Sequence, residues 1–345
     1  MQPGTYHRAI ACRHRTSPMT IALSCAFATS NDSHEHARIA ESLGYTRAWF
    51  YDSPALYPDV WVQLCRAAER TQRIGLGPGV LVPSLRHPMV NAAAISTLAH
   101  LAGEARVAIA IGSGFTGRLT MGQRPLSWKY VAEYVRVVKA LLAGEVTEWE
   151  GRAIQMLHPA GFGAPRPVKV PFIIGAAGPK GLAVANELGD GVFASAPMPE
   201  AGAEWMVLLT MGTVLAPGED PGSVRSIAAA GHAASVRMHW NIEHDPSFDL
   251  SGEGNGPDAW TAVYAKEPER TRHLAIHDQH LIAVNPRDVP FIDGTLLAKQ
   301  GLAMDRGGWR ARFQAFEAQG VTEVAYQPAG PDIPRELEAM AQAAG

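Results

Sequence analysis

The stretch PFIIGAAGPK, residues 171–180, carries the clearest structural signal in this sequence. Its apolar part Pro171–Gly175 predicts a buried strand, and Pro179 suits the first position of the helix predicted over Pro179–Leu188. The glycine-rich turn between them leaves backbone N–H groups facing outward at the helix start, where the helix dipole favours an anion. A buried strand that passes directly into a helix is the repeating unit of α/β folds with a parallel sheet.

The same unit recurs along the chain, as short apolar runs that alternate with longer amphipathic ones. Eight strands are predicted, at Ile21–Cys25, Ala48–Tyr51, Ile74–Val82, Val107–Ile111, Pro171–Gly175, Val192–Ala194, Ser226–Ala230 and Thr322–Tyr326. Helices are predicted between them, at 32–43, Val60–Arg70, Met89–Leu101, Tyr130–Leu142, Pro179–Leu188, Glu204–Leu215 and Trp309–Gln319. This pattern predicts an α/β fold, a (β/α)8 TIM barrel with insertions, and a doubly wound sheet is the alternative.

Several segments depart from the regular alternation of strands and helices. They are the long connection at 115–128, a surface hairpin within 146–157, a proline-rich loop at 159–171 and the unassigned insertion at 241–310. The proline-rich loop is expected to cross the surface, because its prolines cannot join a regular ladder of hydrogen bonds. The barrel is therefore expected to carry additions outside its eight units.

The bulk composition restricts the classes of protein to consider. The chain has 345 residues, 47% of them hydrophobic, and a formal net charge of −3. A chain of this length buries a large core without a metal or disulfide, and we expect one domain over residues 19–345. The near-neutral charge argues against nucleic acid or a membrane surface as a partner. Cys12, Cys25 and Cys65 are widely spaced and odd in number, which favours a cytoplasmic protein.

The first residues allow two interpretations. Arg8, Arg13 and Arg15 precede the apolar run Met19–Ala28, as they would in a signal peptide. Cleavage near Ala28 would remove the first predicted strand and open the barrel. We therefore interpret this run as containing that strand and expect residues 1–18 to form a disordered N-terminal extension.

Active sites of such barrels lie at the carboxyl ends of the strands. The end at Gly175–Lys180 predicts a phosphate cradle, to which Lys180 adds a positive charge; a glycine-rich turn without a ligand is the alternative. The third strand carries three glycines and Pro78, so a bulge is expected at Gly79 and Val80, where it would expose a wall for a flat ring. The same rule selects the further strand ends at Asp52 and Ser53, Gly112–Phe115, and Ser195 and Ala196.

Four segments, Ala40–Asp52, Gly75–Pro88, Arg106–Gly114 and Pro171–Ala194, resemble the luciferase-like family of flavin- and F420-dependent oxidoreductases. The turn after Gly175 and the run from Gly79 to Pro88 resemble its F420-dependent branch, which includes methylenetetrahydromethanopterin reductases. The resemblance implies bound coenzyme F420, or FMN as the alternative, its ring on a bulge that commonly holds a non-prolyl cis peptide, and a homodimer. The expected cofactor-binding residues are Asp52, Gly79, Val80, Gly112, Ser113, Gly114, Gly175, Ala176, Ala177, Gly178, Pro179 and Lys180.

Two positions depart from the pattern of this family. Ser53 stands where several F420 enzymes have histidine after the aspartate, and Phe115 stands where sugar-phosphate dehydrogenases of the family have glutamate. Both changes remove proton-transfer groups, so oxidation of a sugar phosphate is not expected. Phe115 instead favours a hydrophobic or aromatic substrate, and Trp128 in the long connection is a candidate for stacking on it.

Histidines provide candidates for proton transfer. His273, His277 and His280 have the spacing of one helical face, which can bind zinc, but no fourth ligand accompanies them and no metal is expected. His277 and His280 lie in the insertion that could cover the pocket, so they are candidate catalytic residues.

The most specific hypothesis is hydride transfer between reduced F420 and a small molecule with an unsaturated C=C or C=N bond. Asp52 is expected to hydrogen-bond the ring or orient the acceptor, and Ser53 or a nearby histidine to handle a proton. The alternatives are an FMN-dependent monooxygenase and a non-catalytic flavin-binding protein.

Overall fold

The computed structural model describes residues 21–244 and 257–345; the expected extension at 1–18 lies outside them. Eight parallel strands form one sheet in the order β3-β2-β1-β12-β9-β8-β7-β4. Isolated parallel bridges from Leu76 to Val107 and from Leu81 to Ile111 join the two outer strands. The sheet therefore closes on itself, which confirms the (β/α)8 barrel. The strands are β1 (Ala22–Phe27), β2 (Arg47–Phe50), β3 (Gly75–Pro78), β4 (Ile109–Gly112), β7 (Phe172–Gly175), β8 (Gly191–Ala194), β9 (Met206–Met211) and β12 (Glu323–Gln327).

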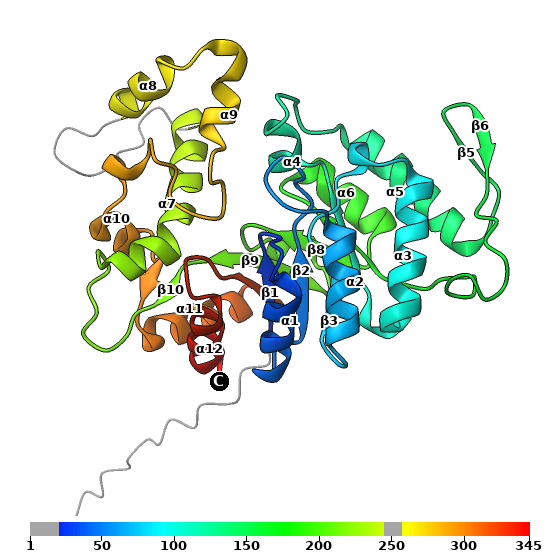
Figure 1. The fold of residues 1–345 in the computed structure, drawn as a ribbon, viewed down its shortest axis with the longest axis horizontal. Helices are drawn as coiled ribbons and strands as arrows, with labels where there is room; N and C mark the ends of the chain where they lie inside the picture. The colour runs from blue at the N-terminus through cyan, green and yellow to red at the C-terminus, as the bar shows by residue number, and fades with distance from the viewer. Residues whose placement is uncertain (1–20, 245–256) are drawn as a thin grey trace, which may run out of the picture.

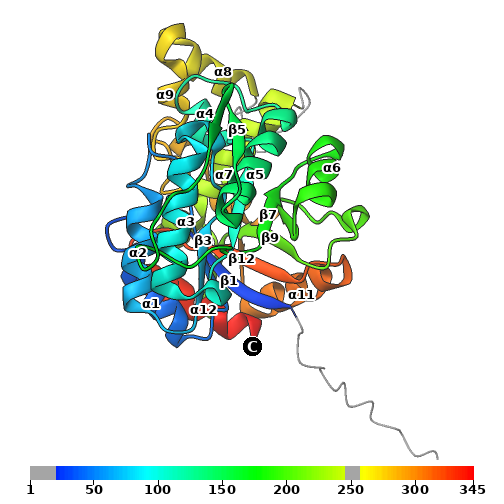
Figure 2. The same ribbon diagram turned by 90° about the vertical axis from the view of Figure 1, so that its right-hand side faces the viewer.

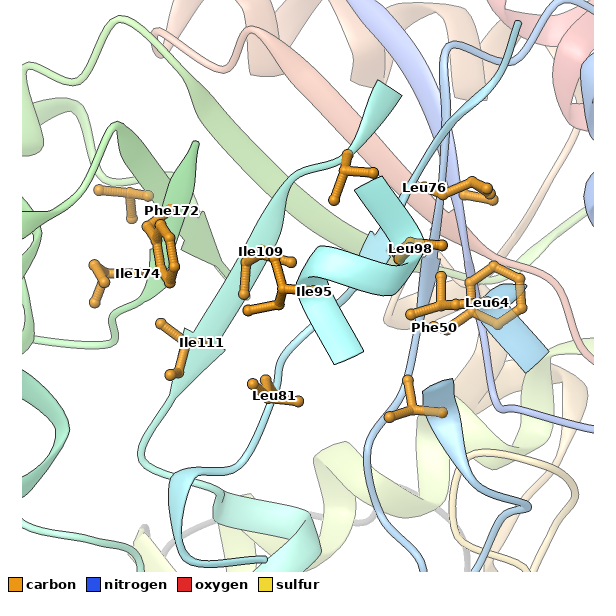
Figure 3. Packing of buried hydrophobic residues seen from close by; sticks show 14 of the residues in the cluster. Phe50, Leu64, Leu76, Leu81, Ile95, Leu98, Ile109, Ile111, Phe172 and Ile174 are labelled. Carbon is orange, nitrogen blue, oxygen red and sulfur yellow. The ribbon is translucent and has the colours of Figure 1, made fainter. Parts of the chain in front are cut away.

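Helices cover the outside of the barrel (Figures 1 and 2). They are α1 (Ser33–Ser42), α2 (Val60–Arg70), α3 (Pro88–Ala102), α5 (Trp128–Ala143), α6 (Pro179–Leu188), α11 (Arg306–Ala318) and α12 (Ile333–Ala344). Figure 3 shows how they pack: Ile95 and Leu98 of α3 lie against Leu76 and Ile109 of neighbouring strands. All four side chains are fully buried. This apolar layer fixes each helix on the sheet, because burying such side chains is the main favourable term in folding.

The predicted helix Glu204–Leu215 and the predicted strand Ser226–Ala230 are both wrong. Met206–Met211 forms β9, which pairs with β8 on one side and β12 on the other, and Ser226–Ala230 lies inside α7 (Val224–His244). A short continuous apolar run fits a buried strand or a buried helix equally well by periodicity, and the run at Ser226 is rich in alanine, the best helix former. The connection from β8 to β9 consequently contains no α-helix, only a 3-10 turn at Pro199–Ala201.

The predicted surface hairpin is confirmed as β5 (Thr147–Trp149) and β6 (Arg152–Ile154), an antiparallel pair. The long connection after β4 holds a short helix, α4 (Phe115–Leu119), which the sequence pattern did not reveal. The third strand ends at Pro78, and the peptide bond between Gly79 and Val80 is cis, as the family resemblance implied. The bulge is therefore present at the place where the glycines predicted it.

The insertion forms a lobe beside the barrel with a core of its own (Figure 1). Its helices after α7 are α8 (Pro257–Ala265), α9 (Arg272–Ile276) and α10 (Gly294–Lys299), and β10 (Thr213–Val214) pairs with β11 (Ala303–Met304). Met238, Trp260 and Leu297 are among the buried residues of this second core. No helix within 21–244 or 257–345 is long and apolar enough to cross a membrane.

The amino ends of the strands are sealed by a polar and aromatic cluster. Glu323 accepts a hydrogen bond from the indole nitrogen of Trp49 (2.8 Å) and another from that of Trp205 (2.9 Å). The Arg47 guanidinium lies 5.2 Å from the ring centroid of each tryptophan. This cluster ties β2, β9 and β12 together at the amino end of the barrel.

Barrel closure depends on Gly77, and we expect Gly77→Ala to lower the stability of the fold. A Cβ at this position would lie 1.8 Å from the carbonyl oxygen of Ala108, so β3 and β4 would have to separate. We expect a loss of about 2 kcal/mol or more in the free energy of unfolding, measured by circular dichroism in denaturant. Gly178→Ala is the matched control, because a Cβ there meets no atom within 4 Å. Equal stability of the two variants would contradict the close approach.

Candidate active site

Three glycine-bearing strand ends meet at the carboxyl side of the barrel. A Cβ on Gly112 would lie 3.1 Å from one methyl group of Val80, and a Cβ on Gly175 would lie 3.0 Å from the other. The Val80 side chain thus packs against the backbone of both glycines. The bulge at Gly79 and Val80 and the ends of β4 and β7 form one continuous surface. That this surface binds the cofactor stays a prediction.

Beside this surface, the start of α6 is open. Gly178 is the N-cap residue, and no side chain of the cap accepts a hydrogen bond from the first turn. Pro179 has no N–H, so the N–H groups of Lys180 and Gly181 are the first donors that lack a partner within the helix. No described atom lies within 4 Å of a Cβ built on Gly178, while Ala177, Pro179 and Lys180 are exposed and Ala176 is buried. Residues 175–181 therefore form an open cradle, with free N–H donors at the start of α6 and one exposed positive charge.

Trp128 flanks this cradle. It is the first residue of α5, and a Cβ on Gly181 would lie 2.7 Å from its ring. The indole therefore packs on the first turn of α6. Stacking of a substrate on Trp128 stays a prediction.

Asp52 is held in a buried ion pair that the sequence analysis missed. Its carboxylate accepts bonds from Arg86 Nη1 (2.8 and 2.9 Å) and from the backbone N–H of Val82 (3.1 Å). Arg86 Nη2 also donates to Asp59 at 2.8 Å. Burial raises the pKa of the Asp52 carboxyl, and the nearby Arg86 opposes this rise. The carboxylate thus fixes the backbone that follows the bulge; Arg86 lies 34 positions away, and no local pattern links the two residues.

Ser53 lies under the short helix α4. Its side chain is buried, and its Oγ lies 3.4 Å from a Cβ built on Gly117. Gly114, the N-cap of α4, has a φ of +78° and would place a Cβ 2.5 Å from Val82. A glycine is required there by backbone conformation and by space. Ser113 is half-buried, and its carbonyl accepts the N–H of Leu126, which folds the long connection back over the end of β4.

An aromatic pair bridges the barrel and the insertion. Phe115 at the start of α4 and Trp240 on α7 have ring centroids 5.5 Å apart at 58°. Phe115 is 43% exposed and Trp240 is 47% exposed. Exposed rings of this size, next to the Gly112–Gly114 turn, offer an apolar surface. Sequence analysis identified Phe115 but not Trp240, because the partner comes from the insertion.

His277 and His280 lie together, but not on one helical face with His273 as predicted. Helix α9 ends at Ile276, and His273 packs beside Gly122. The Nδ1 atoms of His277 and His280 are 3.4 Å apart, and His280 Nε2 lies 3.3 Å from the hydroxyl of Thr116. Burial lowers the pKa of His277 to about 4 and the pKa of His280 to about 3. Both rings are therefore neutral near pH 7. In the described parts of the chain, no cluster of three or more His, Cys, Asp or Glu residues could hold a metal ion.

Comparisons with known proteins show the family of this chain. The sequence model of the luciferase-like monooxygenase family matches residues 8–236. The 5,10-methylenetetrahydromethanopterin reductase of Archaeoglobus fulgidus is 32% identical over 169 residues, which are 48% of this chain and 49% of that protein. An F420-dependent glucose-6-phosphate dehydrogenase of Beutenbergia cavernae is 36% identical over 149 residues, 40% of this chain and 41% of that protein. The chain thus matches about half the length of these relatives or less.

Among solved structures, the coenzyme F420 dependent tetrahydromethanopterin reductase from Methanopyrus kandleri superposes with a TM-score of 0.62 at 20% identity. The superposition covers 94% of this chain and 98% of that one. At this identity the likeness shows a shared fold. It extends through the insertion, beyond the part that the family model matches.

Removing Arg86 would leave the Asp52 carboxylate buried without its partner. We expect Arg86→Gln to lower the free energy of unfolding by about 3 kcal/mol near pH 8. The loss is expected to shrink toward pH 5, because burial has raised the pKa of Asp52 and the unpaired carboxyl takes up a proton there. Chemical unfolding at both pH values measures this difference.

Arg38→Gln is the matched control, because Arg38 makes a 2.8 Å ion pair with Glu35 on the surface. We expect it to cost less than about 0.5 kcal/mol. A loss for Arg86→Gln that is the same at pH 5 and pH 8 would contradict the role assigned to the buried pair.

Proposed function

The chain belongs to the luciferase-like monooxygenase family, and we propose that it is an F420-dependent oxidoreductase. It transfers hydride between reduced F420 and a small molecule with an unsaturated C=C or C=N bond. The observation that carries the proposal is the joint surface of Val80, Gly112 and Gly175 beside the open start of α6. The names of a curated relative and of a similar solved structure, both F420-dependent, support it.

The residues present fit a cofactor with a flat ring and a phosphate. The Lys180 side chain and the N–H groups of Lys180 and Gly181 at the start of α6 would hold the phosphate, because a helix start attracts anions. Val80 would support the ring, with Gly112, Ser113 and Gly114 along its edge. Bound there, F420 would supply a carrier of two electrons in the form of hydride.

The protein's own side chains would position and protonate the acceptor. Asp52 would act by fixing the backbone at Val82, since its oxygens are engaged by Arg86. Ser53, His277 and His280 would handle the proton that accompanies hydride transfer. Neutral imidazoles suit that task, because each ring has one donor and one acceptor nitrogen.

We further propose a hydrophobic or aromatic substrate. Phe115 and Trp240 would provide the wall on which its apolar part lies. Phe115 replaces the glutamate found in the sugar-phosphate dehydrogenases of the family, so a charged base is absent at that position.

Two alternatives use the same site. The cradle is built from backbone N–H groups, which bind the phosphate of FMN as readily as that of F420, so an FMN-dependent monooxygenase is the second candidate. Oxygen consumption with reduced FMN would favour it. Tight binding of either cofactor without turnover of any acceptor would favour a non-catalytic flavin-binding protein.

Cofactor titration tests the proposal directly. We expect F420 to bind at micromolar concentration or below, and Lys180→Ala to weaken binding about tenfold, roughly 1.4 kcal/mol, at low salt. The difference should fall as salt is added, because Lys180 is exposed and its charge is screened. Lys169→Ala, at the opposite end of β7, is the matched control. Quenching of F420 fluorescence measures the affinity for F420. Absence of binding at micromolar concentration would contradict the proposal.

The preference for aromatic over aliphatic acceptors tests whether Phe115 and Trp240 contact the substrate. We expect Phe115→Ala to raise KM about tenfold for an acceptor with an aromatic ring and to change KM little for a small aliphatic one. Steady-state kinetics with both acceptors measures this. Phe162→Ala is the control, because Phe162 is 80% exposed in a distant loop. An equal change in KM for both acceptors in Phe115→Ala would argue against contact between Phe115 and the substrate.

A further inference from the structure

A cavity of about 540 Å³ lies where the insertion meets the barrel. It is separate from the cofactor cradle, since no residue of the cradle lines it. Its walls come from the loop after β2, the end of α4 and the insertion. They include Leu56, Thr120, His277, Asp278, Ile282 and Arg287. A cavity of this size with a polar rim holds water.

From His277 a line of polar contacts leads away from the cavity. His277 Nδ1 faces His280 Nδ1 at 3.4 Å, and His280 Nε2 faces the Thr116 hydroxyl at 3.3 Å. Thr116 follows Phe115 in α4, directly after the Gly112–Gly114 turn at the end of β4. The contacts therefore join the cavity to α4, the helix that begins at the end of β4.

The middle of this line is fixed to the barrel by hydrogen bonds. The Tyr57 hydroxyl donates to the carbonyl of His280 at 2.6 Å, and the Gln327 amide donates to the carbonyl of Leu281 at 2.6 Å. The Tyr51 hydroxyl donates to Gln327 in turn, at 2.9 Å. Leu281 has a φ of +61°, a conformation that is uncommon outside glycine and persists where surrounding contacts impose it. The backbone at His280 and Leu281 is thus held against the barrel.

The surroundings keep both imidazoles uncharged. His280 is 7% exposed, and burial is the main cause of its lowered pKa, followed by the nearby His277, His239 and His232. His239 is itself paired with Asp288 at 2.7 Å. Asp278 lines both the large cavity and the small space beside His280. A neutral pair of rings can pass a proton by exchanging tautomers, without forming a buried charge.

We propose that His277, His280 and Thr116 form a proton relay from the cavity to the substrate. The relay rests on the proposed function, because it supplies the proton that must accompany hydride. In this relay Thr116 donates the proton to the substrate, and the two histidines pass a proton from the cavity to Thr116.

Bound F420 would supply hydride for a new C–H bond at the acceptor carbon, and the π electrons of the double bond would move to the neighbouring atom. That atom takes the proton of the Thr116 hydroxyl, Thr116 takes one from His280 Nε2, and His280 Nδ1 takes one from His277 Nδ1. His277 Nε2 takes a proton from solvent in the cavity, and one proton leaves the oxidised deazaflavin for solvent. Both rings end in the opposite tautomer.

The first test needs no cofactor. Nitrogen-15 spectra of histidine-labelled protein report which ring nitrogen carries the proton, with His277→Gln and His280→Gln to assign the two signals. We expect one of the two rings to be protonated at Nδ1, because an Nδ1–Nδ1 hydrogen bond requires one donor. Protonation of both rings at Nε2 would overturn the relay.

The second test uses reduced F420 and cyclohexenone, a conjugated acceptor. We expect His277→Ala to lower kcat about 100-fold with unchanged affinity for F420, and added imidazole to restore the rate through the cavity. His273→Ala is the control from the adjoining helix α9, because His273 packs beside Gly122, outside the line of contacts. Unchanged kcat in His277→Ala would overturn the relay.

Thr116 is tested by a matched pair of variants. Thr116→Ser keeps the hydroxyl and is expected to retain kcat within about threefold, whereas Thr116→Val keeps the shape and is expected to lose about 100-fold. A wild-type rate in Thr116→Val would overturn the relay. If wild-type protein binds F420 but reduces no acceptor, the proposed function fails, and the tautomer spectra alone decide the relay.

Discussion

The close approach of β3 and β4 is the constraint on which the rest of the structure depends. At Gly77 the two backbones come so near that no side chain can fit between them. This contact closes the barrel and fixes where β3 must end. The chain then bulges at Gly79 and Val80, which brings Val80 onto Gly112 and Gly175. The surface proposed for the cofactor therefore follows from the same glycine spacing that closes the sheet.

The insertion belongs to the site because the barrel holds it. Tyr57 lies in the loop after β2 and Gln327 ends β12, and both donate to backbone carbonyls of the insertion, at His280 and Leu281. Phe115 and Trp240 form a second contact between the two parts. Under the proposed function, the barrel alone would supply the place for the cofactor, and the substrate side would lie where the insertion meets the barrel. Substrate preference would then depend on residues of the insertion that lie far from the cradle in sequence.

The sequence predicted those parts of the molecule that local patterns determine. The glycine-rich ends at Gly79, Gly112 and Gly175 could be located because strand, turn and helix signals are all local. The segment Met206–Met211 could not, because an apolar run of six residues is compatible with a strand or a helix until its neighbours are known. The partners Arg86 and Trp240 could not be inferred either, because each meets its contact across the fold. Long-range pairs of this kind leave no periodicity.

The distribution of charge at the barrel mouth decides which chemistry the site can support. Asp52, whose carboxylate accepts the N–H of Val82 just after the bulge, is engaged by Arg86 and serves to hold the backbone. The titratable groups beside α4 are imidazoles that burial keeps neutral. The carboxylate is occupied by its ion pair with Arg86, and the histidines are weak bases because burial lowers their pKa. The site therefore lacks a strong base for withdrawing a proton from an alcohol. It suits, under the proposed function, the reduction of a neutral unsaturated acceptor, in which a proton is delivered and not removed.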